Sequence, residues 1–173
     1  MANGFVANAH RVDPYKNFKF RVIMNDKVVL GVTKVGSLKR TTEVISHRSG
    51  GDDTHETKSP GKSTFDAVSM ERGITHDREF EVWANMVHQY NGDASMDLVN
   101  YKRDLILEHL NELGQVAYRY FLRKCWVSEF TATPEFDASA NAIAIESLKI
   151  EVEGWERDTG VTEPDEAGAV PAV

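Results

Sequence analysis

The chain has 173 residues, of which 41% are hydrophobic and 27% are charged, and its formal net charge is -7. This length predicts one domain with a sizeable core, and the scattered Lys and Arg argue against specific nucleic-acid binding. The single cysteine, Cys125, excludes an internal disulfide framework, and its apolar surroundings predict a buried, inert thiol. Residues 1–13 contain no apolar run and no segment has the apolar length of a membrane span, so we expect synthesis and folding in a cytoplasm.

The first part of the chain predicts a flexible arm followed by strands. Residues 1–13 are small and polar, which is typical of a flexible N-terminal arm. Apolar residues at every second position predict a half-buried strand over 18–24, and Asn25-Asp26 then favours a tight turn into a returning strand over 28–35. Residues 39–47 are strand-like but polar on both faces, so this strand needs a partner surface or a solvent-filled space.

A glycine-rich polar loop is predicted over residues 48–62, and a connection of this length usually has a function. A strand over 64–72 follows, and Gly73 supplies a permissive backbone for a sharp turn. The next helix is predicted to begin with Thr75 as its N-cap and to run to about Tyr90. Its apolar stripe is formed by Phe80, Trp83, Ala84 and Val87, and Asn91-Gly92-Asp93 ends it.

The second half of the chain predicts more strands. Residues 102–110 fit a helix or a strand, but Asn111 to Gly114 favours a hairpin, so we predict two strands over 102–110 and 115–123. A further strand is predicted over 125–130, and a final one over 142–152 places Ala142, Ala144, Glu146, Leu148, Ile150 and Val152 on one face. Residues 157–173 form an acidic, small-residue tail that predicts disorder.

The sequence contains no complete catalytic motif. Pro60-Gly61-Lys62-Ser63 ends like a phosphate-binding loop, but Glu56 stands where that motif requires its first glycine. No two of the histidines have the spacing of a zinc metalloprotease, so surface positions are a simpler interpretation than a metal site for His10, His47, His55, His76, His88 and His109. We therefore expect no metal and no cofactor.

Three carboxylates around a proline-containing loop are the basis for the alternative that the protein is an enzyme. Glu129, Glu135 and Asp137 resemble a set for glycosidic cleavage, which requires two carboxyl groups at a fixed separation in a cleft. Acidic residues in loops are usually only solvated, and no companion motif supports catalysis here. A small β-rich hydrolase therefore stays an alternative, and we expect that the chain is not an enzyme.

Several short motifs occur in an order that resembles a known family. The most extended is Val68-Ser-Met-Glu-Arg-Gly-Ile-Thr-His-Asp77, a strand, an Arg-Gly pair and a helix start. The others are Asp13 to Val22, Val35-Gly-Ser-Leu38, His47-Arg-Ser-Gly-Gly51, Pro60-Gly61, Cys125-Trp126, Phe136-Asp-Ala138, Ile145-Glu-Ser-Leu148 and Val152-Glu-Gly154. Together they resemble the phage-T4-type tail tube proteins of contractile phages and the inner tube proteins of contractile injection systems.

The resemblance implies a mainly β (α+β) fold, an antiparallel β-sandwich or half-barrel over residues 14–156 with one flanking helix. The strands of six protomers would join into a ring-wide barrel, and stacked hexameric rings would form a tube. It implies that the 48–62 loop makes the contact between rings. The expected contact residues are Arg48, Gly50, Gly51, Asp52, Asp53, Lys58, Pro60, Gly61 and Lys62. Glu43 and Glu71 are candidate lumen-facing residues, and Phe80, Trp83 and Val87 are expected to pack the helix on the outer wall.

The implied partners are other copies of the chain, together with sheath, baseplate and terminator proteins of the same system. Cargo or DNA would pass through the lumen, a membrane would be met only by puncture, and the product would be part of a virion or a released particle. The secreted hexameric ring protein of type VI secretion is the nearest alternative, with a similar strand order. A phage tail, a tailocin-like particle and an extracellular injection system all stay open.

Overall fold

The computed structural model describes residues 14–48, 50, 56–88, 90–92, 96–139 and 141–165. The predicted N-terminal arm, residues 1–13, and the end of the predicted tail, residues 166–173, lie outside the described part. The elements in chain order are β1 (Phe20–Met24), β2 (Lys27–Val29), β3 (Val32–Val35), β4 (Arg40–His47), β5 (Thr57–Phe65), β6 (Val68–Gly73), α1 (Glu79–Ala84), β7 (Arg103–Leu110), β8 (Val116–Thr131), β9 (Ile145–Glu151) and β10 (Gly154–Arg157).

Every strand pair in the described residues is antiparallel. An eight-stranded sheet has the order β2-β1-β7-β8-β9-β6-β3, with β10 on β8, and β4 and β5 form a separate two-stranded sheet. The mainly β, antiparallel fold with one short flanking helix is therefore confirmed. Among the described residues, no helix is long and apolar enough to cross a membrane.

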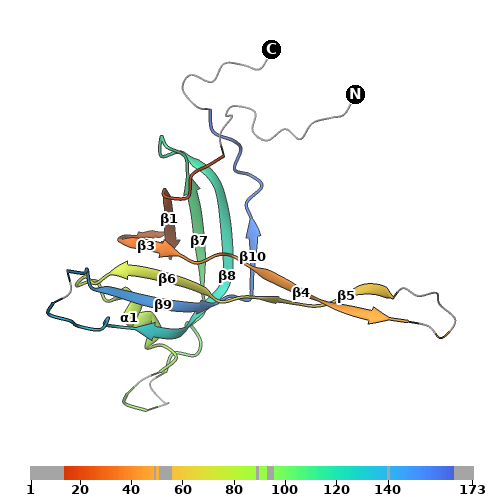
Figure 1. The fold of residues 1–173 in the computed structure, drawn as a ribbon. Coiled ribbons are helices and arrows are strands. Elements are labelled where there is room, and N and C mark those ends of the chain that lie inside the picture. The colour runs from red at the N-terminus through yellow and green to blue at the C-terminus, as the bar shows by residue number, and fades with distance from the viewer. Residues whose placement is uncertain are drawn as a thin grey trace.

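The large sheet bends within β8, which is 16 residues long and belongs to both of its parts (Figure 1). Residues up to Cys125 pair with β7 and β10, and residues from Trp126 pair with β9. Lys124 has a left-handed φ of 51° at this bend. The Asp104 carboxylate accepts a hydrogen bond from the Lys124 amide at 2.8 Å and pairs with Arg123 at 3.0 Å. These contacts hold the pKa of Asp104 below its usual value, the Lys124 amide being the largest cause.

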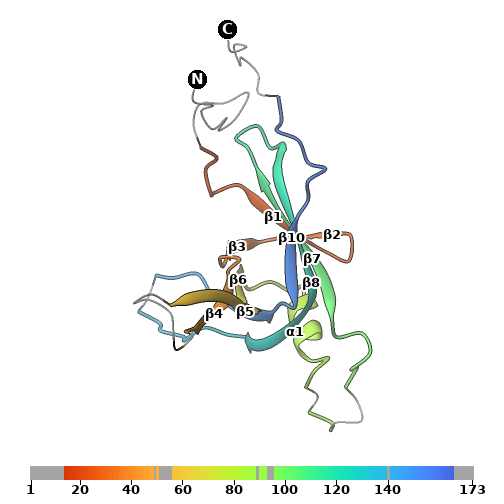
Figure 2. The same cartoon turned by 90° about the vertical axis from the view of Figure 1, so that its right-hand side faces the viewer.

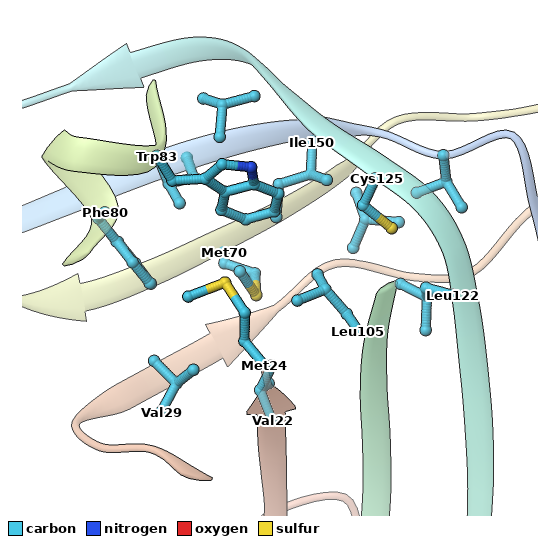
Figure 3. Packing of buried hydrophobic residues seen from close by; sticks show 14 of the residues in the cluster. Val22, Met24, Val29, Met70, Phe80, Trp83, Leu105, Leu122, Cys125 and Ile150 are labelled. Carbon is cyan, nitrogen blue, oxygen red and sulfur yellow. The ribbon is translucent and has the colours of Figure 1, made fainter. Parts of the chain in front are cut away.

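The hydrophobic core fills the space between the two parts of the sheet and α1 (Figure 3). Phe80 and Trp83 of α1 are almost fully buried, and the Trp83 indole N–H donates to the Tyr101 carbonyl at 2.8 Å. The strands contribute further core side chains, among them Met24 of β1, Val68 and Met70 of β6, Leu105 of β7, Leu122, Cys125 and Val127 of β8, and Leu148 and Ile150 of β9. The large sheet and α1 are together called the body below. Burial of this apolar surface is the main source of its stability.

The first hairpin follows the sequence prediction, but the returning strand does not. Asn25 and Asp26 take the positive φ values of 51° and 61° that a tight hairpin turn requires. The strand predicted over 28–35 breaks at Gly31, where φ is 78°, into β2 and β3. β2 pairs with β1 whereas β3 pairs with β6, so the chain crosses here between the two ends of the sheet.

The helix is shorter than predicted. It begins after Arg78 and ends at Ala84, so Val87 lies beyond it and is half-buried. Thr75 is not the N-cap: its hydroxyl accepts from the Asp77 amide, and the Asp77 carboxylate accepts from the Glu79 amide. These side-chain-to-backbone bonds stabilise the non-helical residues 75–78 that precede the helix. Gly73 is the last residue of β6 and is outside the set of glycines with positive φ, so the predicted sharp turn is wrong.

The second half confirms two strands around the 111–114 hairpin, β7 and β8. The final strand is shorter than predicted, because β9 starts at Ile145 and Ala142 and Ala144 precede it, although Glu146, Leu148, Ile150 and Val152 are buried as expected. The sequence prediction missed β10. This strand pairs with β8 and continues to Arg157, and the Asp158 amide donates to the Arg119 carbonyl at 2.9 Å.

Candidate assembly surfaces

The two-stranded sheet of β4 and β5, called the ribbon below, projects from the body on the side away from β3 (Figure 1). All eight residues of β4 are exposed, and within β5 only Gly61 and Phe65 are half-buried. The 48–62 segment was predicted to be a loop, but β5 begins at Thr57 and pairs with β4 over its length. The polar strand β4, which contributes nothing to the core, therefore pairs with this segment, although the segment contains Pro60 and Gly61.

Close packing across the ribbon explains the glycine at position 61. A Cβ there would lie 3.1 Å from Ile45 Cγ1 and 3.3 Å from Glu43 Cβ, so a side chain would fit only if these neighbouring side chains shifted slightly. Val44 is the cross-strand partner of Pro60, and the Thr42 and Ser63 hydroxyls lie 2.7 Å apart. The ribbon is therefore an ordered pair of strands.

The base of the ribbon is attached to the body through Trp155 of β10. The Phe65 ring meets the Trp155 ring edge to face at 5.9 Å, and the Arg40 guanidinium lies 6.0 Å from its centroid. Tyr120 of β8 also contacts the Trp155 ring edge to face, at 5.8 Å. Lys39 and Asp66, which flank the two ribbon strands, pair with each other at 2.9 Å. The ring contacts of Trp155 thus connect the base of the ribbon to the body, and Figure 2 views the molecule from the side on which the ribbon projects.

The residues expected to contact the next ring fall on different parts of the ribbon. Lys58, Pro60, Gly61 and Lys62 lie on β5, whereas Arg48 and Gly50 follow β4. Gly51, Asp52 and Asp53 lie outside the described residues.

The two candidate lumen residues are not neighbours. Glu43 is exposed on β4, and Glu71 is half-buried on β6, where its carboxylate accepts from Lys34 Nζ at 2.7 Å. The structure therefore places one of these charges on the ribbon and the other on the body, and a shared lumen surface stays a prediction.

A groove opens where the free edge of β3 faces β1, β7 and β8. Its volume is about 350 Å³, and Val35, Leu107 and Tyr118 contribute to its lining. The His109 ring stacks on Tyr118 at 4.6 Å, and its Nε2–H donates to the Lys16 carbonyl at 2.7 Å. In a neutral imidazole ring, that bond leaves Nδ1 as an acceptor. Nδ1 is buried and has no hydrogen-bond partner among the described residues.

A buried ionic network joins α1 to the body. Arg72 of β6 is 1% exposed, and its guanidinium pairs with Glu146 at 2.6 Å and with Asp77 at 2.8 Å. It also lies 4.1 Å from the centroid of the Phe80 ring. Sequence reasoning marked the Arg72-Gly73 pair only as a strand end, because the partners at 77 and 146 come together only in the folded chain.

The residues considered for chemistry are dispersed. Within the described ranges, no group of three or more His, Cys, Asp or Glu side chains is arranged to hold a metal ion. Glu129 is exposed on β8, and Glu135 and Asp137 are exposed in the following loop, where Asp137 accepts hydrogen bonds from Ser139. Burial raises the pKa of the Cys125 thiol to about 12, so this cysteine is not a nucleophile at neutral pH.

Comparison with protein families identifies the family of the chain. The profile of the family described as T4-like virus tail tube protein gp19 matches residues 16–156. The chain belongs to this family. Its members are structural proteins, and the chain is accordingly a structural protomer of the inner tube. No curated protein matches the chain by sequence.

Solved structures of contractile injection systems have the same fold. A chain of the anti-feeding prophage tube-terminating cap has a TM-score of 0.73 at 21% identity, over 91% of this chain and 99% of that chain. A chain of the PVC sheath-tube complex in the extended state has a TM-score of 0.69 at 20% identity, over 84% and 91%. Hcp1 from Flavobacterium johnsoniae has a TM-score of 0.51 at 13% identity, over 84% and 98%.

Proposed function

We propose that this tail tube protein forms hexameric rings that stack into the inner tube of a contractile particle, with the ribbon as the contact between rings. The fully exposed strand β4 carries this proposal, because its eight residues are paired with β5 yet bury no side chain within the described chain. Val44 and Ile45 expose 65% and 53% of their surface there. Exposed apolar side chains of this kind often mark an interaction site, and a partner that covers them would bury their apolar surface.

The free edges of the large sheet support ring formation. β2 and β3 are the terminal strands of the sheet order, and each leaves one row of backbone groups unpaired within the described chain. Exposed edges are usually protected in natural proteins. Pairing between neighbouring copies protects both edges and closes a ring when the rotation between copies is the right fraction of a turn.

The partners follow from the same assignment. Similar folds occur in a sheath-tube complex and in a tube-terminating cap, so we assign sheath, terminator and baseplate proteins of the same system as partners. Cargo or DNA passes through the lumen, a membrane is met only by puncture, and the protein is made in a bacterial cytoplasm before it joins a virion or released particle. It has no enzymatic activity, and Glu43 and Glu71 contribute negative potential to the lumen.

A secreted ring protein of type VI secretion is the second candidate. The fold similarity to Hcp1 favours it at the level of chain topology alone. The two functions differ in stability of the stack, because a tube must persist within a sheath, whereas a secreted ring must separate.

Electron microscopy of the purified full-length chain tests the proposal. Negative-stain images at rising concentration should contain rings and then tubes. A variant in which a two-residue Asn-Gly turn replaces residues 42–63 should keep the rings and lose the tubes, since short turns close antiparallel strands readily. A chain that stays monomeric at high concentration contradicts ring formation, and normal tube growth by the shortened variant contradicts the role of the ribbon.

A further inference from the structure

The groove beside β3 has the properties of a surface that another chain covers. Leu107 and Val35, which also pack against the hydrophobic core, line its open space of about 350 Å³. His109 is 8% exposed, and its Nδ1 is a buried acceptor without a partner among the described residues. Buried polar atoms in native proteins nearly always have a partner. The groove therefore lacks an apolar occupant that also brings a hydrogen-bond donor.

One face of the ribbon has this chemistry. Val44 and Pro60 are cross-strand partners, so their side chains share a face, and both residues are exposed. Ser46 lies two residues beyond Val44 in β4, so its hydroxyl is directed to the same side. Lys58 is the cross-strand partner of Ser46 and shares this side as well. The face thus combines an apolar pair with two hydrogen-bond donors, the Ser46 hydroxyl and the Lys58 ammonium, and all four residues are exposed.

The placement of the two surfaces fits a repeated contact. The ribbon leaves the body on one side and β3 lies on the other (Figure 1), so one chain cannot insert its ribbon into its own groove. A projection on one side and a recess on the opposite side produce a head-to-tail contact, which propagates without limit when it does not close on itself. Stacked rings require a contact of this type.

We propose that the Val44–Pro60 face of the ribbon docks in the β3 groove of a second copy in the adjacent ring. This assignment rests on the proposed function, since it names the receiving surface for the ribbon. Val44 packs against Val35 and Leu107 of the second copy, and a ribbon hydroxyl donates to His109 Nδ1.

Engineered cysteines test the contact in assembled tubes. Val44→Cys combined with Thr33→Cys, at the exposed rim of the groove, should give a ladder of covalent oligomers after mild oxidation. The matched control is Val44→Cys with Thr131→Cys, which places the second thiol at an exposed position outside the groove. Cys125 is 0% exposed and stays out of the reaction. Tubes that give no ladder with the first pair, or equal ladders with both pairs, overturn the docking while the proposed function stands.

A groove-filling variant gives an independent readout. Thr33→Trp should reduce the fraction of stacked rings by about tenfold or more, as blocking a central interface pocket commonly does, whereas Thr131→Trp should stack normally. Equal stacking by the two variants overturns the docking. Absence of tubes from the unmodified chain instead contradicts the proposed function, so the two failures are distinguishable.

Discussion

The body and the ribbon of this protein use similar strands in opposite ways. In β6 and β9 every second side chain is buried, and Val68, Met70, Leu148 and Ile150 are at most 2% exposed. In β4 no residue is buried, and Val44 exposes 65% of its surface. Hydrophobic burial within one chain stabilises the body, whereas the ribbon has backbone pairing and its attachment at Trp155. The buried side chains of the body therefore stabilise the fold of the protomer, and the exposed side chains of the ribbon are the ones we expect to act in assembly.

The strongest way to break the body is to empty its core. Trp83→Ala should lower the free energy of unfolding by about 3–5 kcal/mol, because it leaves a large cavity between α1 and the sheet. Urea denaturation of the monomer measures this change. Val82→Ala, on the exposed side of the same helix, should change stability by less than about 0.5 kcal/mol. Equal effects of the two variants would contradict the packing of α1.

The buried ion pair of the body should come next in size. Arg72→Met leaves the Glu146 carboxylate buried without its partner and should cost about 3 kcal/mol or more in urea unfolding. The double variant Arg72→Met, Glu146→Met should recover much of that loss, since no uncompensated charge stays buried. Arg78→Met is the matched control, because the Arg78–Glu81 pair is exposed. A double variant as unstable as the single one would contradict this interpretation.

The bend of β8 should show a smaller, pH-dependent effect. The folded-state pKa of Asp104 is lowered, so its contribution is complete above its unfolded pKa of about 4 and is lost as pH falls through the lower folded value. The side chain is half exposed, so the contribution should be below about 1 kcal/mol. Asp104→Asn should flatten the stability profile below about pH 4 and leave the profile above neutrality parallel to that of the unmodified chain. An unchanged acid limb would show that the Lys124 and Arg123 contacts do not stabilise the ionised carboxylate.

The ribbon should show the smallest effect on folding and a large one on assembly. Val44→Asp should change the free energy of unfolding by no more than about 0.5 kcal/mol, because the side chain is exposed in the protomer. The same variant should fail to form tubes, as judged by sedimentation of assembled material. Thr57→Asp, an exposed ribbon position outside the Val44–Pro60 pair, is the control for added charge. A loss of stability above about 2 kcal/mol for Val44→Asp would place this residue in the core instead.

Local chemistry made much of the body predictable from sequence. Asn25-Asp26 predicted a hairpin turn because both residues tolerate positive φ, and alternation around Leu148 and Ile150 identified the buried face of β9. In the ribbon, β4 was predicted as a strand, but β5 was missed, because Pro60 and Gly61 are typical of loops and the pairing that orders them comes from β4. Gly31 divided a predicted strand because β2 and β3 have different partners.

Features that depend on distant contacts were not predictable from local pattern. The helix was expected to reach Tyr90, but it ends at Ala84, and Met86 in the following turn packs against the core instead of the predicted Val87. The groove at His109 depends on the register of β1, β7 and β8 and on where β3 ends beside them. The local sequence pattern contains no signal for the end of the helix or for the groove. The role of the ribbon residues stays a prediction.

Cryo-electron microscopy of assembled particles tests the central claim most directly. The account predicts stacked hexameric rings in which the ribbon of each protomer crosses to the adjacent ring and places Val44 against a neighbouring copy. A map in which the ribbon stays within its own ring, or extends into solvent while the rings stack through other surfaces, would contradict the account.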